Sequence, residues 1–221
     1  MTIYDISEPI EPQTAVFPGD TPFSVEWVAR LERGDSCNVS TMRMSVHCGS
    51  HSDAPLHYVP GGQDIASVAL DRYLGRCRVL EVTGRGSPKL VDPADLAGRL
   101  EGVERLLLRT SRTHDHRRFD PDFTALGPDA ARVLAASGLR LVGIDSPSMD
   151  HAASKDLPAH HVLAAAGIAL LENLDLSAVP VDPERGTDYE LIALPLRIVG
   201  GDSAPVRAVL RPLRRADSAT R

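Results

Sequence analysis

The segment on which the assignment of this chain depends reads His47-Cys48-Gly49-Ser50-His51-Ser52-Asp53-Ala54-Pro55-Leu56-His57. Its three histidines and its aspartate follow one another at spacings of four, two and four residues. Even spacings place side chains on one side of an extended backbone, and Gly49 and Pro55 allow the chain to turn so that these groups converge. Imidazole nitrogen and carboxylate oxygen are standard ligands of Zn2+ and Mn2+, and three such ligands with an open position suit catalysis. The segment therefore predicts a metal site.

A surface loop or a different catalytic motif accounts for the segment less well. A Gly/Ser-rich surface loop would account for one isolated histidine, but not for three histidines and an aspartate at this density. His47 and His51 enclose Cys-Gly-Ser rather than a helical glutamate, so the HExxH site of helical metalloproteases is not supported. The sequence also has no G-x-S-x-G nucleophile motif and no P-loop or Rossmann glycine pattern. Serine-nucleophile, phosphate and dinucleotide chemistry are therefore not expected.

A second group of polar side chains lies at Asp156–Leu163 and Leu171–Leu174. Adjacent side chains point in different directions, so at most one of His160 and His161 is expected to be a ligand. Glu172 ends an apolar run, where a carboxylate is costly unless it is paired or bound to a metal. Judged from its own context alone, Glu172 could equally be a glutamate that emerges into solvent at a strand end.

Short apolar runs bounded by Gly, Pro or Asp predict a strand-rich chain. Thr41–Val46 alternates as a half-buried strand would, leading into His47. The other predicted strands are Ile3–Ser7, Val25–Ala29, Arg78–Val82, Arg105–Arg109, Leu139–Ile144, Ala169–Glu172, Leu191–Ile198 and Val206–Leu210. Helices are predicted from Asp92-Pro93 through Leu100, over Pro128–Ser137 and over Pro158–Ala166. Several connections are too short for a crossover helix, so we predict a mixed α+β domain with barrel-like or layered sheets.

Length and composition predict one domain. A chain of 221 residues with 43% hydrophobic content is long enough for one sizeable core. We expect the domain to span residues 1–212, followed by a flexible polar tail at 213–221. The stretch Glu8–Pro22 combines four prolines and one glycine in one loop, which is typical of a binding rim.

Charge and terminal sequence exclude several partners. The net charge of −6 offers no broad attraction for nucleic acid or for an anionic membrane, and neither is expected as a partner. The sequence begins without a basic and apolar leader, and no apolar run approaches the roughly 20 residues that span a bilayer. We therefore expect a cytoplasmic protein. Its three cysteines lack CxxC spacing and are expected to be reduced thiols.

The segment at 47–57 resembles the H-x-G-T-H-x-D-x-P-x-H signature of the cyclase-like metal hydrolases, and among them the bacterial kynurenine formamidases are the most similar. The resemblance covers nearly the whole chain. It also includes Asp5-Ile6-Ser7, residues 17–22 (FPGDTP), Asn38-Val39-Ser40, residues 143–150 (GIDSPSMD), Leu157-Pro158-Ala159-His160, Leu171-Glu172-Asn173-Leu174 and Leu194-Pro195-Leu196-Arg197. Ser50 replaces the threonine of the signature.

The resemblance implies a swivelling β/β/α-type fold and a homodimer or larger homo-oligomer. It implies a site for two Zn2+ ions in each subunit, with Mn2+ or another divalent metal as alternatives that the ligand types allow equally. The implied reaction is hydrolysis of N-formyl-L-kynurenine to L-kynurenine and formate, a step of tryptophan breakdown.

Site roles follow from the same resemblance. One metal would be bound by His47, His51 and Asp53, and the other by Asp53, His160 and Glu172, with Glu172 open to sharing. His160 rather than His161 fits the H-x-x-L pattern with Leu163. His57 matches the catalytic acid/base and Phe17 the aromatic residue that contacts the substrate, in its own or a neighbouring subunit.

These roles form a consistent mechanism. Two cations that share a carboxylate lower the pKa of a bound water toward neutrality and polarise the formyl carbonyl. An aryl amide expels its nitrogen poorly unless that nitrogen is protonated, and a histidine such as His57 exchanges protons near neutral pH. A related hydrolase of another aryl or cyclic amide, such as isatin, is the alternative within the family. A metal-binding protein without turnover is the alternative outside it, although such a protein would not need His57.

Overall fold

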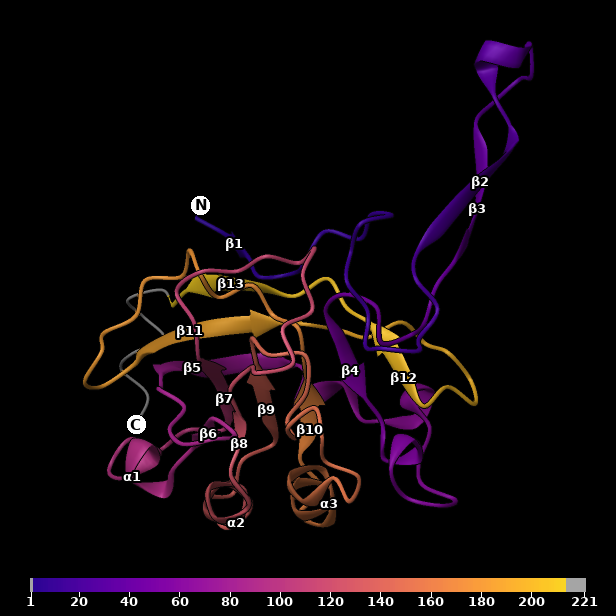
Figure 1. Ribbon diagram of the computed structural model, residues 1–221. Helices are drawn as coiled ribbons and strands as arrows, with labels where there is room; N and C mark the ends of the chain where they lie inside the picture. The colour runs from indigo at the N-terminus through magenta and orange to yellow at the C-terminus, as the bar shows by residue number, and fades with distance from the viewer. Residues whose placement is uncertain (1, 214–221) are drawn as a thin grey trace.

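One seven-stranded sheet crosses the computed structural model, which describes residues 2–213 (Figure 1). In spatial order its strands are β1 (Tyr4–Asp5), β13 (Val209–Pro212), β11 (Thr187–Ile192), β5 (Leu74–Glu81), β7 (Arg105–Arg109), β9 (Leu141–Ile144) and β10 (Ala169–Leu171). Neighbouring strands are antiparallel from β1 to β5 and parallel from β5 to β10. The mixed sheet confirms the predicted α+β class.

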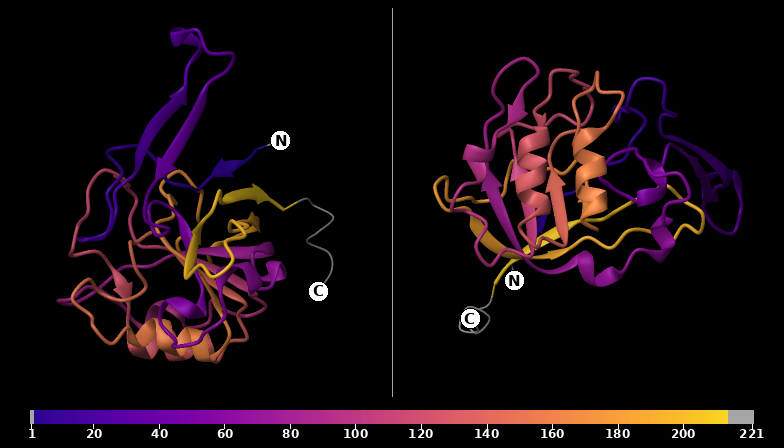
Figure 2. Two further views of the ribbon diagram at one scale, coloured as in Figure 1. Left: turned by 90° about the vertical axis from the view of Figure 1, so that its right-hand side faces the viewer. Right: turned by 90° about the horizontal axis from the view of Figure 1, so that it is seen from below.

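Three helices lie on one face of the parallel half of the sheet (Figures 1 and 2). They are α1 (Pro93–Leu96), α2 (Pro128–Ala135) and α3 (Pro158–Ala165). Each begins at the proline that was predicted to start it, and the fixed φ of proline suits the first helical position. The Asp92 side chain caps α1 by accepting a hydrogen bond from the Ala94 amide. The expected extension of α1 to Leu100 is wrong, because Ala97 already has an extended ψ of 126°.

Each face of the sheet has its own hydrophobic core. Along β7, Leu106 and Leu108 belong to the core on the helix side, whereas Leu107 belongs to the core on the opposite side. All five residues of β7 are buried, as expected for a parallel strand that is covered on both faces. The loops at the ends of these central strands are therefore held by a rigid framework.

Part of the motif at residues 47–57 forms a short strand beside the main sheet. Strand β4 (His51–Asp53) pairs antiparallel with β12 (Ser203–Pro205), so that Ser203 lies opposite Asp53. On its other side β4 bridges to Glu172, the residue directly after β10. His51 and Glu172 exchange backbone hydrogen bonds of 3.3 and 3.1 Å. These bonds bring the motif at 47–57 to the carboxyl end of β10.

The remaining elements connect these layers. Strands β6 (Leu90–Val91) and β8 (Ala125–Leu126) form a parallel pair near the helices. Within residues 2–213 the connections also include short 3-10 helices at Leu31–Arg33, Pro55–His57, Ile65–Ser67 and Leu70–Arg72.

A two-stranded arm projects from the body of the molecule (Figures 1 and 2). It consists of β2 (Ser24–Ala29) and β3 (Val39–Arg43), paired antiparallel from Ser24 opposite Arg43. Every residue of β3 is exposed, so the expectation of a half-buried strand over Thr41–Val46 is wrong. The alternation of that segment reflects two faces of a free ribbon rather than a core face and a solvent face.

Strand boundaries near the carboxyl end also differ from expectation. The strand predicted at Leu191–Ile198 is β11, which starts earlier at Thr187 and ends at Ile192, shortly before Pro195. The strand predicted at Val206–Leu210 is replaced by β12 before it and β13 at Val209–Pro212. Residues 206–208 turn between the two sheets, and Val206 forms only an isolated bridge to Pro195.

Within residues 2–213, no helix combines the length and the apolar character that a membrane span requires. The tail predicted at 213–221 lies, apart from residue 213, outside the described residues. The domain boundary at residue 212 stays a prediction.

Candidate metal centre and active site

A cluster of four buried ionisable side chains lies where β4, β10 and α3 meet. The cluster consists of His51, Asp53, His160 and Glu172, none more than 3% exposed. Nε2 of His51 lies 3.4 Å from both the Asp53 and the Glu172 carboxylates. Nε2 of His160 lies 3.5 Å from Asp53 and 3.2 Å from Glu172. Two imidazole nitrogens and two carboxylates thus face one small volume.

The histidines are oriented by hydrogen bonds at their other ring nitrogen. Nδ1 of His51 donates to the Gly49 carbonyl at 2.9 Å, which leaves Nε2 as the atom aimed at the carboxylates. Nδ1 of His160 lies 2.6 Å from Asp150 Oδ2, and the Asp150 carboxylate also accepts the Ala159 and His160 amides at the start of α3. Such outer contacts fix the ring and the free nitrogen of a histidine ligand.

His47 extends the cluster toward solvent. Its Nδ1 lies 3.1 Å from Asp53 Oδ1, and its side chain is 17% exposed. Donor atoms of His47, His51 and Asp53 all lie within 4.8 Å of one another, and so do those of Asp53, His160 and Glu172. Asp53 belongs to both groups and stands at the centre of the arrangement.

The donor set fits divalent cations. Nε2 of His51 and both carboxylate oxygens of Asp53 are buried and have no hydrogen-bond partner within residues 2–213. Burying polar and charged groups without partners is costly, and coordination of a cation would satisfy all three atoms together. Two imidazoles and a shared carboxylate are ligand types that Zn2+ and Mn2+ both accept.

The electrostatics of the cluster demand positive charge. Burial alone would lower the pKa of His51, but the Asp53 and Glu172 carboxylates raise it to about 10. Burial also opposes the charged form of His160, yet Asp150, Asp53 and Glu172 raise its pKa well above the ordinary value. Without a metal the acids therefore hold protons on the histidines. Cations bound there would replace those protons, because histidine ligates a metal in its neutral form.

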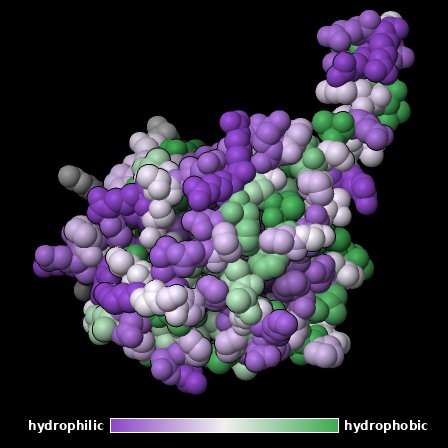
Figure 3. All heavy atoms as spheres, in the orientation of Figure 1, coloured by the Kyte–Doolittle hydropathy of each residue, from purple (hydrophilic) through white to green (hydrophobic). Residues whose placement is uncertain are grey.

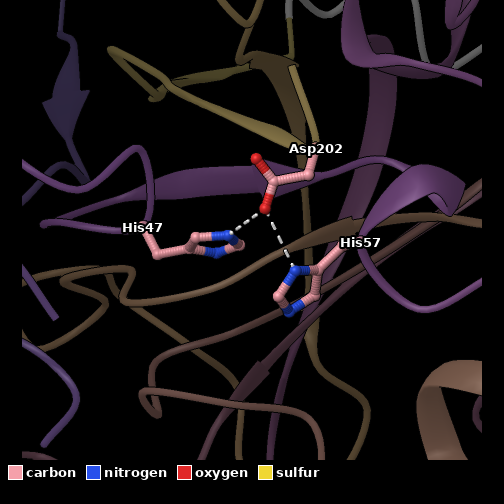
Figure 4. Close-up of side chains that lie close together, drawn as sticks. All are labelled: His47, His57 and Asp202. Atoms are coloured by element: carbon pink, nitrogen blue, oxygen red, sulfur yellow. Dashed lines mark hydrogen bonds and ion pairs between the residues drawn. The ribbon is translucent and has the colours of Figure 1, made fainter. Parts of the chain in front are cut away.

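A third group joins His47 to the predicted acid/base. Asp202 Oδ2 lies 3.0 Å from Nε2 of His47 and 3.2 Å from Nδ1 of His57, so the carboxylate stands between the two rings (Figure 4). The centroids of those rings are 4.3 Å apart. His57 is the last residue of the 3-10 turn Pro55–His57. Its side chain is 33% exposed, so it borders the cluster on the solvent side.

A cavity of about 510 Å³ adjoins the cluster. It reaches the metal motif at His47, while the four buried members of the cluster and His57 lie outside its lining. Phe17 stands in its wall with Phe119 and Phe123; ring centroids are 5.2 Å apart for Phe17 and Phe119 and 6.3 Å apart for Phe119 and Phe123. The volume is in the range of pockets that take small molecules. Its aromatic wall suits a planar ring.

Comparison with known proteins identifies the family. The model of the family described as "Putative cyclase" matches residues 4–151, which is more than half of the 221-residue chain. The chain belongs to the cyclase family. This confirms the cyclase-like family that the motif at 47–57 predicts.

Solved structures agree with this family over nearly the whole chain. A protein described as a potential metal-dependent hydrolase with cyclase activity is 30% identical, with a TM-score of 0.79 over 95% of this chain and 96% of that one. A predicted metal-dependent hydrolase from Bacillus stearothermophilus is 29% identical, with a TM-score of 0.76 over 95% and 97%. Isatin hydrolase A from Labrenzia aggregata, with benzyl benzoate bound, is 22% identical, with a TM-score of 0.74 over 96% and 94%. At 22% identity, the similarity to isatin hydrolase A shows a shared fold.

In this cyclase-family protein the site residues expected from the sequence occupy two places. The five expected metal ligands come together around Asp53, and His57 lies beside His47. Phe17 lies in the cavity wall. His161 is exposed on α3, whereas His160 is buried, and the ligand role of His160 stays a prediction.

Four residues of the site were not predicted. Asp150 lies in a segment that the sequence marked only by resemblance, well before α3 begins at Pro158, so no local pattern linked its carboxylate to the amides of that helix. Asp202 precedes β12, and only the pairing of β12 with β4 brings it to His57. Phe119 and Phe123 lie in a polar stretch without strand or helix periodicity, so no local signal placed them beside Phe17.

Two acid–histidine pairs hold the cavity wall together. His114 Nε2 lies 2.7 Å from Glu8 Oε1, and His116 Nε2 lies 2.7 Å from Glu11 Oε1. The Ala15 amide also donates to the His116 carbonyl at 2.8 Å. The amino-terminal loop and the loop at 110–124 are thereby joined across the cavity.

The first of these pairs predicts a measurable titration. Burial alone would lower the pKa of His114, but the Glu8 carboxylate raises it above the ordinary histidine value. Because the folded pKa is raised, the pair stabilises the fold fully below the unfolded pKa, and this stabilisation is lost as pH rises through the folded value. We expect an NMR titration to give a raised pKa for His114 that falls in Glu8→Gln. Glu11→Gln, which removes the partner of His116, should leave the pKa of His114 nearly unchanged. An unshifted His114 in the wild type would contradict the pairing.

Proposed function

We propose that this cyclase-family protein is a metal-dependent arylformamidase that hydrolyses N-formyl-L-kynurenine to L-kynurenine and formate. In this reaction water adds to the formyl carbon, the carbon–nitrogen bond breaks and the aniline nitrogen gains a proton. The observation that carries the proposal is the cavity with three phenylalanine rings that opens onto His47 at the edge of the buried acid–histidine cluster. An aryl group bound in this cavity would lie next to His47.

The proposed metal ligands follow the two groups around Asp53. One cation would be held by His47, His51 and Asp53, and the other by Asp53, His160 and Glu172. Zn2+ is proposed for both positions, and Mn2+ suits the same donors. When bound, such cations lower the pKa of a nearby water and withdraw electrons from a carbonyl.

His57 is the proposed acid/base. It borders the ligands without belonging to either group around Asp53, and partial exposure lets it exchange protons with substrate and solvent. In the proposed reaction it accepts a proton from water during attack and donates one to the leaving aniline nitrogen. A positioned general acid/base contributes typically about 10²–10⁴-fold to a rate.

The cavity supports an amino-acid-bearing aryl substrate. Phe17, Phe119 and Phe123 would contact its ring. The lining also carries charges of both signs, including Arg118 and Asp115. Such a lining suits the ammonium and carboxylate groups of kynurenine. The alternative substrate, isatin, is favoured by the fold shared with isatin hydrolases, but isatin has no charged group that would use these charges of the cavity lining.

An activity assay tests the proposal. We expect the zinc-loaded protein to release kynurenine from N-formyl-L-kynurenine faster than it opens isatin, to lose this activity on chelation and to regain it with Zn2+. His57→Gln should lower kcat by about 10²–10⁴-fold. His161→Gln, which changes the exposed neighbour of His160, is the matched control and should keep activity.

Two results would contradict the proposal. Turnover of isatin without turnover of N-formyl-L-kynurenine would show that isatin, and not the formamide, is the substrate. Full formamidase activity after complete chelation would remove the metal from the mechanism.

We further propose a homodimer in which the arm contacts a second copy. An isolated two-stranded ribbon is marginally stable in water, so an arm held clear of its own domain needs a partner surface. Its strands expose large apolar side chains, among them Val28 at 68% and Met42 at 60%. Apolar side chains gather along the shaft of the arm, whereas its tip is hydrophilic (Figure 3). A cytoplasmic location, expected from the sequence, belongs to the same proposal.

Sedimentation equilibrium tests the role of the arm. We expect a dimer mass for the wild type and a shift toward monomer for the double variant Val28→Lys, Met42→Lys. Glu32→Lys, at the hydrophilic tip, produces the same change in net charge without removing apolar surface and should remain dimeric. A monomeric wild type, or a double variant that dimerises as tightly as the wild type, would exclude the arm as the interface.

A further inference from the structure

The carboxylate of Asp202 contacts both His47 and His57. Its Oδ2 lies 3.2 Å from Nδ1 of His57 and 3.0 Å from Nε2 of His47 (Figure 4). An ionised carboxylate only accepts hydrogen bonds, so a neutral imidazole that contacts it must carry its hydrogen on the contacting nitrogen. For His57 that nitrogen is Nδ1, and Nε2 is left with a free lone pair.

The backbone holds Asp202 at this place. Its carbonyl accepts the amide of Ala54, at the start of the turn that carries His57, at 2.9 Å. The next residue, Ser203, pairs with Asp53 between β12 and β4. The preceding residue, Gly201, accepts the Ile65 amide at 2.9 Å through its carbonyl. The carboxylate is thus carried by a strand end that is fixed to the same turn as its target.

We propose that Asp202 is a positioning residue that fixes the ring orientation and the tautomer of His57, so that Nε2 is the atom that exchanges protons during hydrolysis. This rests on the proposed function of His57 as acid/base. In the first step Nε2 accepts a proton from the attacking water, and in the second it returns that proton to the leaving nitrogen, while the Nδ1 proton stays on the ring and donates to Asp202. By its second contact the same carboxylate accepts Nε2–H of His47 and leaves Nδ1 of that ring facing Asp53.

Asp202→Asn is the informative variant because it keeps the shape of the side chain while it replaces the anionic acceptor by a neutral amide with a donor. An amide can turn its NH2 group toward Nδ1 of His57, which favours the opposite tautomer with hydrogen on Nε2. Removing an outer partner of this kind typically costs about 10–100-fold in activity or in metal affinity. We expect kcat to fall by about this factor with a much smaller change in KM. Asp202→Glu should recover part of kcat because it restores a carboxylate.

Asp64→Asn provides the matched control. Asp64 accepts the Gly200 amide at 2.7 Å through Oδ2, so it holds the same loop without contacting either histidine. If Asp202 only maintained that loop, the two asparagine variants would behave alike. We expect Asp64→Asn to leave the His57 tautomer and both kcat and KM near the wild-type values.

The deciding measurement is the tautomer of His57 in the zinc-loaded full-length protein, read from long-range 1H–15N NMR spectra of 15N-histidine-labelled samples. We expect the Nδ1–H form in the wild type and in Asp64→Asn, and its loss in Asp202→Asn. An Nε2–H tautomer in the wild type would overturn the proposal, and so would a cation coordinated by Nδ1 of His57. Because the spectra need no substrate, they give a result even if N-formyl-L-kynurenine is not turned over, which would count against the proposed function alone.

Discussion

The burial of two carboxylates beside the same two histidines is the constraint on which the structure of this site depends. Asp53 and Glu172 are both almost inaccessible, and each lies within 3.5 Å of His51 and His160. An uncompensated ion inside a protein costs several kcal/mol, so the pair exists only with positive charge beside it. Protons on the histidines or divalent cations can supply that charge. Metal binding at this site would therefore release protons from the histidines.

The fold satisfies this constraint by pairing segments that are far apart in sequence. Strand β4 is held between the end of β10 and β12, which places His51 and Asp53 beside Glu172 on one side and Asp202 on the other. Helix α3 contributes His160 from its first turn, where Asp150 binds both the helix amides and the ring. Asp150 thus contacts His160, Asp202 contacts His47 and His57, and the Gly49 carbonyl accepts a hydrogen bond from the remaining ring, that of His51. Of the site residues described above, His47 lines the adjoining cavity, whose wall also includes the rings of Phe17, Phe119 and Phe123.

Local sequence predicted the parts of this site whose geometry is local. The density of histidine and aspartate at 47–57 depends only on a short strand and a turn, and each of the three helices begins at the proline that predicted its start. His160 and Glu172 required a resemblance, because nothing in their own surroundings specifies which strand they meet. Asp202 was missed for the same reason. The arm was misjudged because alternation does not distinguish a half-buried strand from a free ribbon.

Asp53 is the proposed ligand of both metal ions, and metal content per chain is the most direct test of that role. Wild-type protein and Asp53→Asn would be equilibrated with Zn2+, freed of excess metal and measured by inductively coupled plasma mass spectrometry, with circular dichroism to verify folding. We expect close to two zinc ions per wild-type chain and loss of both in the folded variant, because both groups of donors contain Asp53. A folded wild type that binds no metal, or a variant that retains both ions, would contradict it.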